Sequence, residues 1–225
     1  MITDNFYDPF KSWYKGGNIW LYSDPHFNDP EMKNLRKNYI GDEEQVKRIN
    51  SKVGKKDTII FLGDIGDLSY ISKIKGYKIL IAGNHDTGLS NFKRLITWKT
   101  INDDGMVQII PEEERQYIKS REEMELLNIK IEDNHLFDEV YSGPVFISDK
   151  ILLSHEPILN YSCAFNIHGH DHSNSLNDNF HLNLCAELIN YTPVALNKII
   201  ESGAMKYVKN IHRETIDNAI KKKRK

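Results

Sequence analysis

Cysteine is scarce in this sequence of 225 residues, which contains only Cys163 and Cys185. Two cysteines are too few for a disulfide framework, so we expect a reduced, cytoplasmic protein. No stretch approaches the roughly 18 apolar residues of a membrane span, and we expect no membrane partner. The first residues, MITDNFYDPFKSWYKGG, lack the apolar core of a signal peptide.

Net charge is also low, at −2. That total includes five positive charges at residues 221–225, KKKRK, so residues 1–220 together carry −7. An acidic body with a basic end is not typical of a protein that coats DNA. A basic end can bind nucleic acid, but such ends are more often solvated and disordered, so nucleic acid is not the favoured partner.

Short apolar runs recur along the chain, and each is followed directly by polar residues. The runs are NIWLYS (18–23), TIIFL (58–62), KILIA (78–82), ILLS (151–154) and CAFNI (163–167). Continuous apolar runs, without alternation, predict strands buried on both faces. Helical patterns at 42–53 and 68–75 lie between strands, which predicts βαβ units and an α/β layered fold.

The rest of the chain adds elements around this pattern. Two strands around an Asp-Gly turn are expected within 97–110, and a helix over 112–128. We interpret 97–135 as a hairpin-plus-helix insert in a single domain of residues 1–220. The insert would lie beside the site, or else form a surface decoration or dimer contact; the oligomeric state is open. A strand at 179–185 and helices at 193–203 and 204–220 complete the prediction.

Ligand-type side chains stand at the carboxyl ends of the predicted strands, where α/β sheets bind their ligands. They are Asp24, His26, Asp64, Asn84, His155, His170 and His172. Mixed nitrogen and oxygen ligands suit Mn, Fe, Zn, Co or Ni. Seven ligands are too many for one tetrahedral ion, and they suit two divalent ions that share a bridge.

The charge of such a centre predicts the class of substrate. Two divalent ions bring four positive charges, whereas Asp24, Asp64 and a bridging hydroxide remove three, so the pocket should prefer an anion such as a phosphate ester. His85, held by Asp86, could stabilise the transferring phosphoryl group or protonate the leaving oxygen. The alternative is that His85 is a structural loop histidine. His168 is expected to be buried and hydrogen-bonded, and His135, His181 and His212 to be structural or surface residues.

Five blocks in this order resemble those of the calcineurin-like metallophosphoesterases: DPH (24–26), GDIGD (63–67), GNHD (83–86), SHEP (154–157) and GHDH (169–172). NYTPVALNKI (190–199) resembles the closing segment of small bacterial and phage members.

The resemblance implies a four-layer α/β/β/α sandwich and a dinuclear centre, with Mn²⁺ favoured. One ion would be held by Asp24, His26, Asp64 and His172, and the other by Asp64, Asn84, His155 and His170. The resemblance also makes His85 the catalytic histidine and Asp86 its orienting acid.

Several residues depart from the family pattern, and they disfavour a phosphatase that acts on phosphoproteins. Leu68 and Ser69 follow Asp67, where protein phosphatases of this superfamily have arginine and glycine, and Asp86 replaces their glutamate. Asn28 stands where small relatives often have another histidine, which leaves substrate contacts on this loop open. Arg36 and Asn50 are candidate contacts to a phosphate or nucleotide, although a surface arginine and a helix-surface amide are the better interpretations.

The sequence thus predicts a metallophosphoesterase that hydrolyses a small phosphodiester or nucleotide by attack of a metal-bridging hydroxide. A non-catalytic scaffold that keeps the fold is the alternative from another class, but such relatives usually lack ligands or the catalytic histidine. Among enzymes, a nuclease guided by the basic end is the alternative, but no aromatic platform for single strands is evident.

Overall fold

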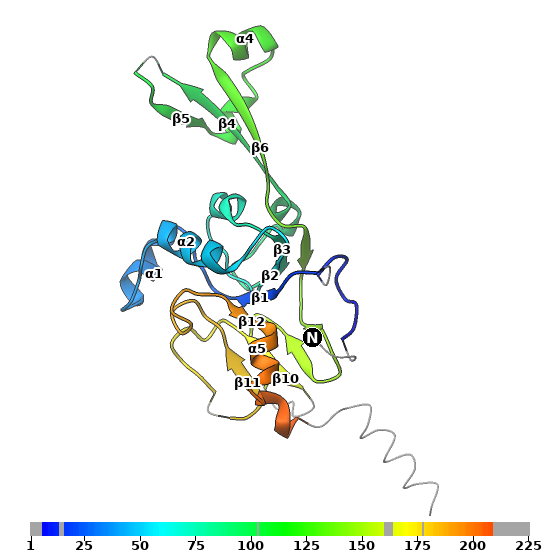
Figure 1. Cartoon of the computed structure of the whole chain (residues 1–225). Coiled ribbons are helices and arrows are strands. Elements are labelled where there is room, and N and C mark those ends of the chain that lie inside the picture. Colours follow the sequence, from blue (N-terminus) through cyan, green and yellow to red (C-terminus); the bar gives the residue numbers. More distant parts are fainter. Residues whose placement is uncertain (1–5, 14–15, 103, 160–163, 177, 209–225) are drawn as a thin grey trace, which may run out of the picture.

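The computed structural model describes residues 6–13, 16–102, 104–159, 164–176 and 178–208 (Figure 1). Two mixed sheets form the body. The first has the order β12-β1-β2-β3-β7 and consists of Val194–Ala195, Ile19–Tyr22, Thr58–Phe61, Tyr77–Ile81 and Glu139–Tyr141. The second has the order β11-β10-β9-β8 and consists of His181–Asn183, Phe165–His168, Ile151–Leu153 and Val145–Phe146. All neighbouring strands are parallel except β12 with β1 and β8 with β9.

The apolar runs divide their side chains between two cores. In β2 and the residue after it, Ile60 and Leu62 pack with Leu153 and Ile167 of the second sheet. Ile59 and Phe61 point to the other face of the first sheet and pack in the second core. Both faces of β2 are therefore buried, which explains why its sequence is continuously apolar.

Short helices cover the outer face of the first sheet and border its loops (Figure 1). α2 (Asp42–Lys52) packs Val46 and Ile49 into the second core. α1 (Pro30–Leu35) follows β1 and is capped by the Asp29 carboxylate. The 3₁₀ helices η1 (Leu68–Lys73) and η2 (Leu89–Phe92) follow β2 and β3, and α5 (Leu196–Glu201) and η3 (Ala204–Tyr207) end the described chain.

A three-stranded antiparallel sheet with the order β5-β4-β6 projects away from the body (Figure 1). We call residues 94–135 the arm. It contains β4 (Arg94–Ile101), β5 (Val107–Ile110), α3 (Glu112–Arg115), α4 (Arg121–Leu126) and β6 (Ile129–His135). Arg94 and His135 face each other in the pairing of β4 with β6, so the arm leaves and re-enters the body at one point.

Several predicted boundaries are wrong. The helix expected over 112–128 is two short helices, because Ser120 starts α4 with a capping box to Glu123. The strand β6 was not predicted at all. The helix expected from 193 begins at Leu196 after the short strand β12, and that expected over 204–220 is described only to Val208 as a 3₁₀ turn. The rest of that helix, the basic end and Cys163 lie outside the described residues.

The predicted α/β class and the strands at 18–23, 58–62, 78–82 and 151–154 are confirmed. Within the described ranges, no helix has the length and apolar character needed to span a lipid bilayer. The fold thus places the carboxyl ends of two parallel sets of strands where their polar loops can meet.

Candidate metal centre

The pairing of the first sheet brings three polar loops to one edge. The strands β1, β2 and β3 are in register up to their last residues. The loops that follow them, with Asp24, Asp64 and Asn84, therefore begin at the same edge. Backbone hydrogen bonds join the first two loops, among them those from Asp24 N to Gly63 O (3.1 Å) and from His26 N to Asp64 O (3.1 Å).

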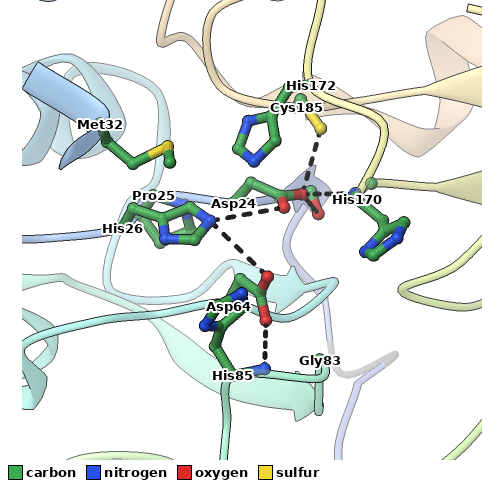
Figure 2. Close-up of polar contacts among 12 residues, drawn as sticks. Asp24, Pro25, His26, Met32, Asp64, Gly83, His85, His170, His172 and Cys185 are labelled. Carbon is green, nitrogen blue, oxygen red and sulfur yellow. Dashed lines mark hydrogen bonds and ion pairs between the residues drawn. The ribbon is translucent and has the colours of Figure 1, made fainter. Parts of the chain in front are cut away.

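The second sheet contributes the three remaining histidines. His155 follows β9, while His170 and His172 follow β10. The backbone N–H of Gly169 donates to the His155 carbonyl at 2.9 Å, and that of His170 donates to Asp24 Oδ2 at 3.0 Å. The second of these bonds crosses from one sheet to the other, and it places the two sets of loops around a common space (Figure 2).

Four predicted ligands surround one point in this space. Asn84 Oδ1 lies 2.8 Å from His155 Nε2 and 3.1 Å from His170 Nδ1. His155 Nε2 lies 3.2 Å from His170 Nδ1 and 3.3 Å from Asp64 Oδ2. Metal–ligand bonds of about 2.1 Å would separate neighbouring ligand atoms by about 3.0–3.4 Å, so these four atoms fit a divalent ion.

His155 is oriented for such a role. Its Nδ1 donates to the Leu62 carbonyl at 2.8 Å, which directs Nε2 toward the other ligands. Burial lowers the pKa of His155, but the hydrogen bond and negative charge of Asp64 outweigh this effect and raise the pKa to about 9. The metal-free protein therefore holds a proton at the position that an ion would take, and metal binding would release it.

A second group consists of Asp24, His26 and Asp64, whose ligand atoms lie within 4.8 Å of one another. Asp24 Oδ1 and His26 Nε2 are buried, 3.8 Å apart, and neither has a hydrogen-bond partner. Leaving a buried polar atom unpaired costs about 1–3 kcal/mol, and an ion between these atoms would satisfy both. Burial lowers the pKa of His26, which favours the neutral imidazole that binds metals.

His172 borders this second group. Its ring centroid lies 5.2 Å from that of His26, and its Nδ1 donates to Glu187 Oε1 at 2.9 Å. The other oxygen of Glu187 lies 3.2 Å from Arg36 Nε. Burial raises the pKa of Glu187, but His172 and Arg36 outweigh burial and hold it below its ordinary value. The charged Glu187 thus orients His172 with its Nε2 toward Asp24.

Asp24 is itself held by three donors on one oxygen. Its Oδ2 accepts from the backbone of His170, lies 2.5 Å from Ser23 Oγ, and lies 3.2 Å from Cys185 Sγ. Burial and the Asp24 carboxylate both raise the pKa of Cys185, so its sulfur stays protonated and donates. Cys185 therefore donates to Asp24 Oδ2 and leaves Asp24 Oδ1 open to the common space. The Cys185 sulfur also forms a group of possible metal ligands with Asp24 and His172, whose ligand atoms lie within 4.8 Å of one another.

The backbone of these loops is strained at the predicted ligands. Asp24, His26, Asp64, His170 and His172 all have φ between 46° and 68°, in the left-handed region. Non-glycine residues there cost of order 1–3 kcal/mol each, and such strain clusters at functional sites. The surrounding hydrogen bonds maintain this conformation even though it opposes folding.

Glycines in the same loops leave room for the ligands. A Cβ on Gly83 would lie 2.2 Å from Asp64 Oδ1, and one on Gly169 would lie 2.1 Å from Asp24 Oδ2. Any larger residue at these two positions would displace a carboxylate. The glycine that precedes a ligand in these blocks is thus part of the site.

The part of the chain that contains these loops matches a known family. The model of the calcineurin-like phosphoesterases matches residues 17–186, which covers most of the chain and all five sequence blocks. The chain belongs to this family. An uncharacterised protein of Methanocaldococcus jannaschii is 29% identical over 207 aligned positions, which cover 82% of this chain and 92% of the relative. A crystal structure of a protein of unknown function from Aquifex aeolicus has a TM-score of 0.51 at 20% identity and covers 83% of this chain and 99% of that chain, a likeness of fold alone.

His85 lies exposed at the rim of the centre. Its backbone N–H donates to Asp64 Oδ1 at 3.0 Å, and its ring centroid lies 5.6 Å from that of His26 (Figure 2). The Asp86 carboxylate accepts from the backbone N–H groups of Asp64, Ile65 and Gly83 at 2.8–3.0 Å. Asp86 thus joins the two loops that carry Asp64 and His85, and its carboxylate oxygens are engaged with backbone amides.

The three predicted substrate contacts lie in different environments. Arg36 is buried, and its guanidinium donates to the carbonyls of Asp24 (2.6 Å) and Pro25 (3.2 Å), so it is not a surface arginine. Asn50 binds the backbone of Lys73 and Lys75 on the outside of α2. Asn28 is exposed at the end of its loop, with a hydrogen bond of 3.4 Å to Asp67.

The other described histidines make contacts away from the ligand groups. His168 is completely buried and its Nδ1 contacts the Gly169 carbonyl at 2.8 Å. His181 bridges Asp178 and the Ile158 carbonyl, and His135 contacts Asp138 at the surface. His212 lies outside the described residues.

Sequence reasoning missed three residues of the centre, Ser23, Cys185 and Glu187. Each stands at the carboxyl end of a strand or just after it, as the predicted ligands do. The position of Glu187 after the run NFHLNLC could have identified it. The hydrogen bond of Cys185 to Asp24 spans 161 residues and has no signal in the sequence.

Proposed function

We propose that this protein is a metal-dependent phosphoesterase that hydrolyses a small phosphodiester or nucleotide at a dinuclear centre. The observation that carries the proposal is the position of Asp64, which belongs both to the group with Asp24 and His26 and to the group with His155 and His170. One carboxylate shared by two groups of ligands suits a pair of neighbouring ions. Family membership supports metal-dependent phosphoester hydrolysis independently of this geometry.

The charge of the centre favours an anionic substrate. Two divalent ions would bring four positive charges, and Asp24 and Asp64 would remove two. Glu187 adds no net charge, because it is paired with Arg36. When bound, the ions would supply Lewis acidity and an activated water, and the positive centre would attract and hold a phosphate group.

The residues around the centre would divide the remaining tasks. His85, exposed at the rim, would contact the phosphoryl oxygens or donate a proton to the leaving oxygen. Asp86 would fix the loop that carries His85 through its three backbone hydrogen bonds. Asn84 would ligate through a neutral oxygen, which preserves the positive charge of the centre. Manganese suits the mixed nitrogen and oxygen ligands, and iron, zinc, nickel and cobalt remain candidates.

The proposal is tested by metal-dependent hydrolysis. We expect the purified full chain to hydrolyse bis(p-nitrophenyl) phosphate in the presence of Mn²⁺, to lose this activity after treatment with a chelator, and to regain it when Mn²⁺ is restored. Release of p-nitrophenol and the number of bound ions are measured on the same samples. Equal rates with and without the chelator would refute a metal-dependent mechanism.

Two outcomes would favour the alternatives. Binding of two ions without hydrolysis of any phosphate ester would favour a non-catalytic scaffold. Faster cleavage of single-stranded DNA or RNA than of small diesters, with steep dependence on salt, would favour a nuclease.

A further inference from the structure

Two cavities border the candidate metal centre at different ligands. The larger, of about 430 Å³, is lined by α1 and the turn after it (Met32, 35–38), by 172–173 and by 187–188. We call it the α1 cavity. The other, of about 300 Å³, is lined by the Asn84 and His155 loops and by residues 142–144. His172 belongs to the first cavity and Asn84 to the second, so the two cavities contact opposite ligand groups of the centre.

The α1 cavity borders the centre at His172. His172 forms part of its wall, and this side chain is about one-third exposed. Figure 2 shows Met32 on the side of the cluster where His26 and His172 lie, with Gly83 across the cluster. A phosphate held at the centre would therefore direct one of its ester groups into this cavity.

The walls of the α1 cavity are apolar where a ligand could touch them. Met32 is half-buried, while Leu35 and Leu188 are 69% and 43% exposed. The charges of the buried Arg36 and the partly buried Glu187 offer little to a ligand, because each is engaged by the other and by neighbouring protein groups. Lys37, Asn38 and Ser173, all exposed, supply further polar groups, and His172 borders the centre.

We infer, on the basis of the proposed function, that the α1 cavity binds an aromatic, base-sized group on the substrate, as in a nucleotide. A volume of about 430 Å³ lies within the range of small-molecule sites, about 300–1,000 Å³. Met32, Leu35 and Leu188 would contact the faces of the ring, and Asn38 would hydrogen-bond its edge. The second cavity can take the other arm of a diester, which a monoester lacks.

The test compares two ligands that differ only in the base. Binding to the manganese-loaded full chain is measured by calorimetry with non-hydrolysable phosphonate analogues of uridine 5′-monophosphate and of ribose 5-phosphate. We expect the uridine analogue to bind roughly tenfold more tightly, because apolar pocket contacts are worth about 10–200-fold. Leu188→Ala should reduce this ratio at least threefold without changing the affinity for the ribose analogue.

The matched control is Leu126→Ala, which truncates an 86% exposed leucine of the arm and should leave the ratio unchanged. If Leu188→Ala disturbs the neighbouring Glu187 and loses metal, Leu35→Ala gives the same test from the exposed side of the cavity. Equal affinities of the wild-type chain for the two ligands, or a ratio that neither leucine variant changes, would overturn the inference. Because binding is measured without turnover, a protein that prefers the base but hydrolyses no ester would refute the proposed function alone.

Discussion

At the scale of single residues, the centre combines strain with unsatisfied polar atoms. Five predicted ligands have left-handed backbone conformations, and Asp24 Oδ1 and His26 Nε2 are buried without partners. Both features destabilise the metal-free chain. Bound ions would offset this cost, since a ligand that binds only the folded state stabilises it.

Asp64→Asn should abolish hydrolysis and reduce the number of bound metal ions. The substitution removes one negative charge from the carboxylate that both ligand groups share. We expect the bound metal to fall from two ions to one or none, measured by elemental analysis of the dialysed protein. Retention of both ions would show that Asp64 does not bridge them.

The matched variant is His85→Ala, which removes an exposed ring that no ligand group includes. It should retain both ions and lower turnover roughly 10²–10⁴-fold, the usual contribution of a positioned acid or base. A change of only a few-fold would remove His85 from the chemistry.

At the scale of elements, the sequence allowed us to predict the strands with continuous apolar runs and the ligands at their carboxyl ends. Three strands of the first sheet, β1, β2 and β3, were identified, because apolar runs such as TIIFL are long enough to distinguish, whereas the short strands β7 and β12 were not. All seven predicted ligands lie around one space, because parallel strands bring their carboxyl ends to the same edge. The strand β6 was missed, because IKIEDNH is mostly exposed and alternates only weakly. The buried position of Arg36 was missed too, because its partners, such as Glu187, are distant in sequence.

The arm should be dispensable for the centre. We expect a chain in which Arg94 is joined to His135 by Asn-Gly to bind metal and hydrolyse bis(p-nitrophenyl) phosphate as the full chain does. Arg94 and His135 are paired, and a two-residue turn closes such a pair. No described residue of the arm lines either cavity beside the centre. Metal content and cooperative thermal unfolding are the measurements, and loss of either would show that residues 94–135 belong to the folding unit.

At the scale of the whole molecule, stability rests on two cores that share the first sheet. Most strand residues that face these cores are apolar, but Lys78 of β3 is 93% buried. Its Nζ contacts the Ile74 carbonyl at 3.2 Å, and its backbone pairs with Asp138. Burial lowers the pKa of Lys78 below 10.5, and the Asp138 carboxylate only partly opposes this effect.

Lys78→Met should therefore stabilise the protein at neutral pH. When the pKa of a lysine is lower in the folded state, burying its ammonium destabilises the protein fully below that folded pKa. The cost fades as pH rises toward the unfolded value near 10.5.

We expect a gain of about 1 kcal/mol in the free energy of unfolding at pH 7, the order of one buried polar group, and a smaller gain at pH 10. Urea denaturation at both pH values, in the same chelating buffer, measures the gain. Lys130→Met on the exposed face of β6 is the control, expected within about 0.5 kcal/mol of wild type. A loss of stability at pH 7 would mean that the contact with Ile74 outweighs the burial of the charge.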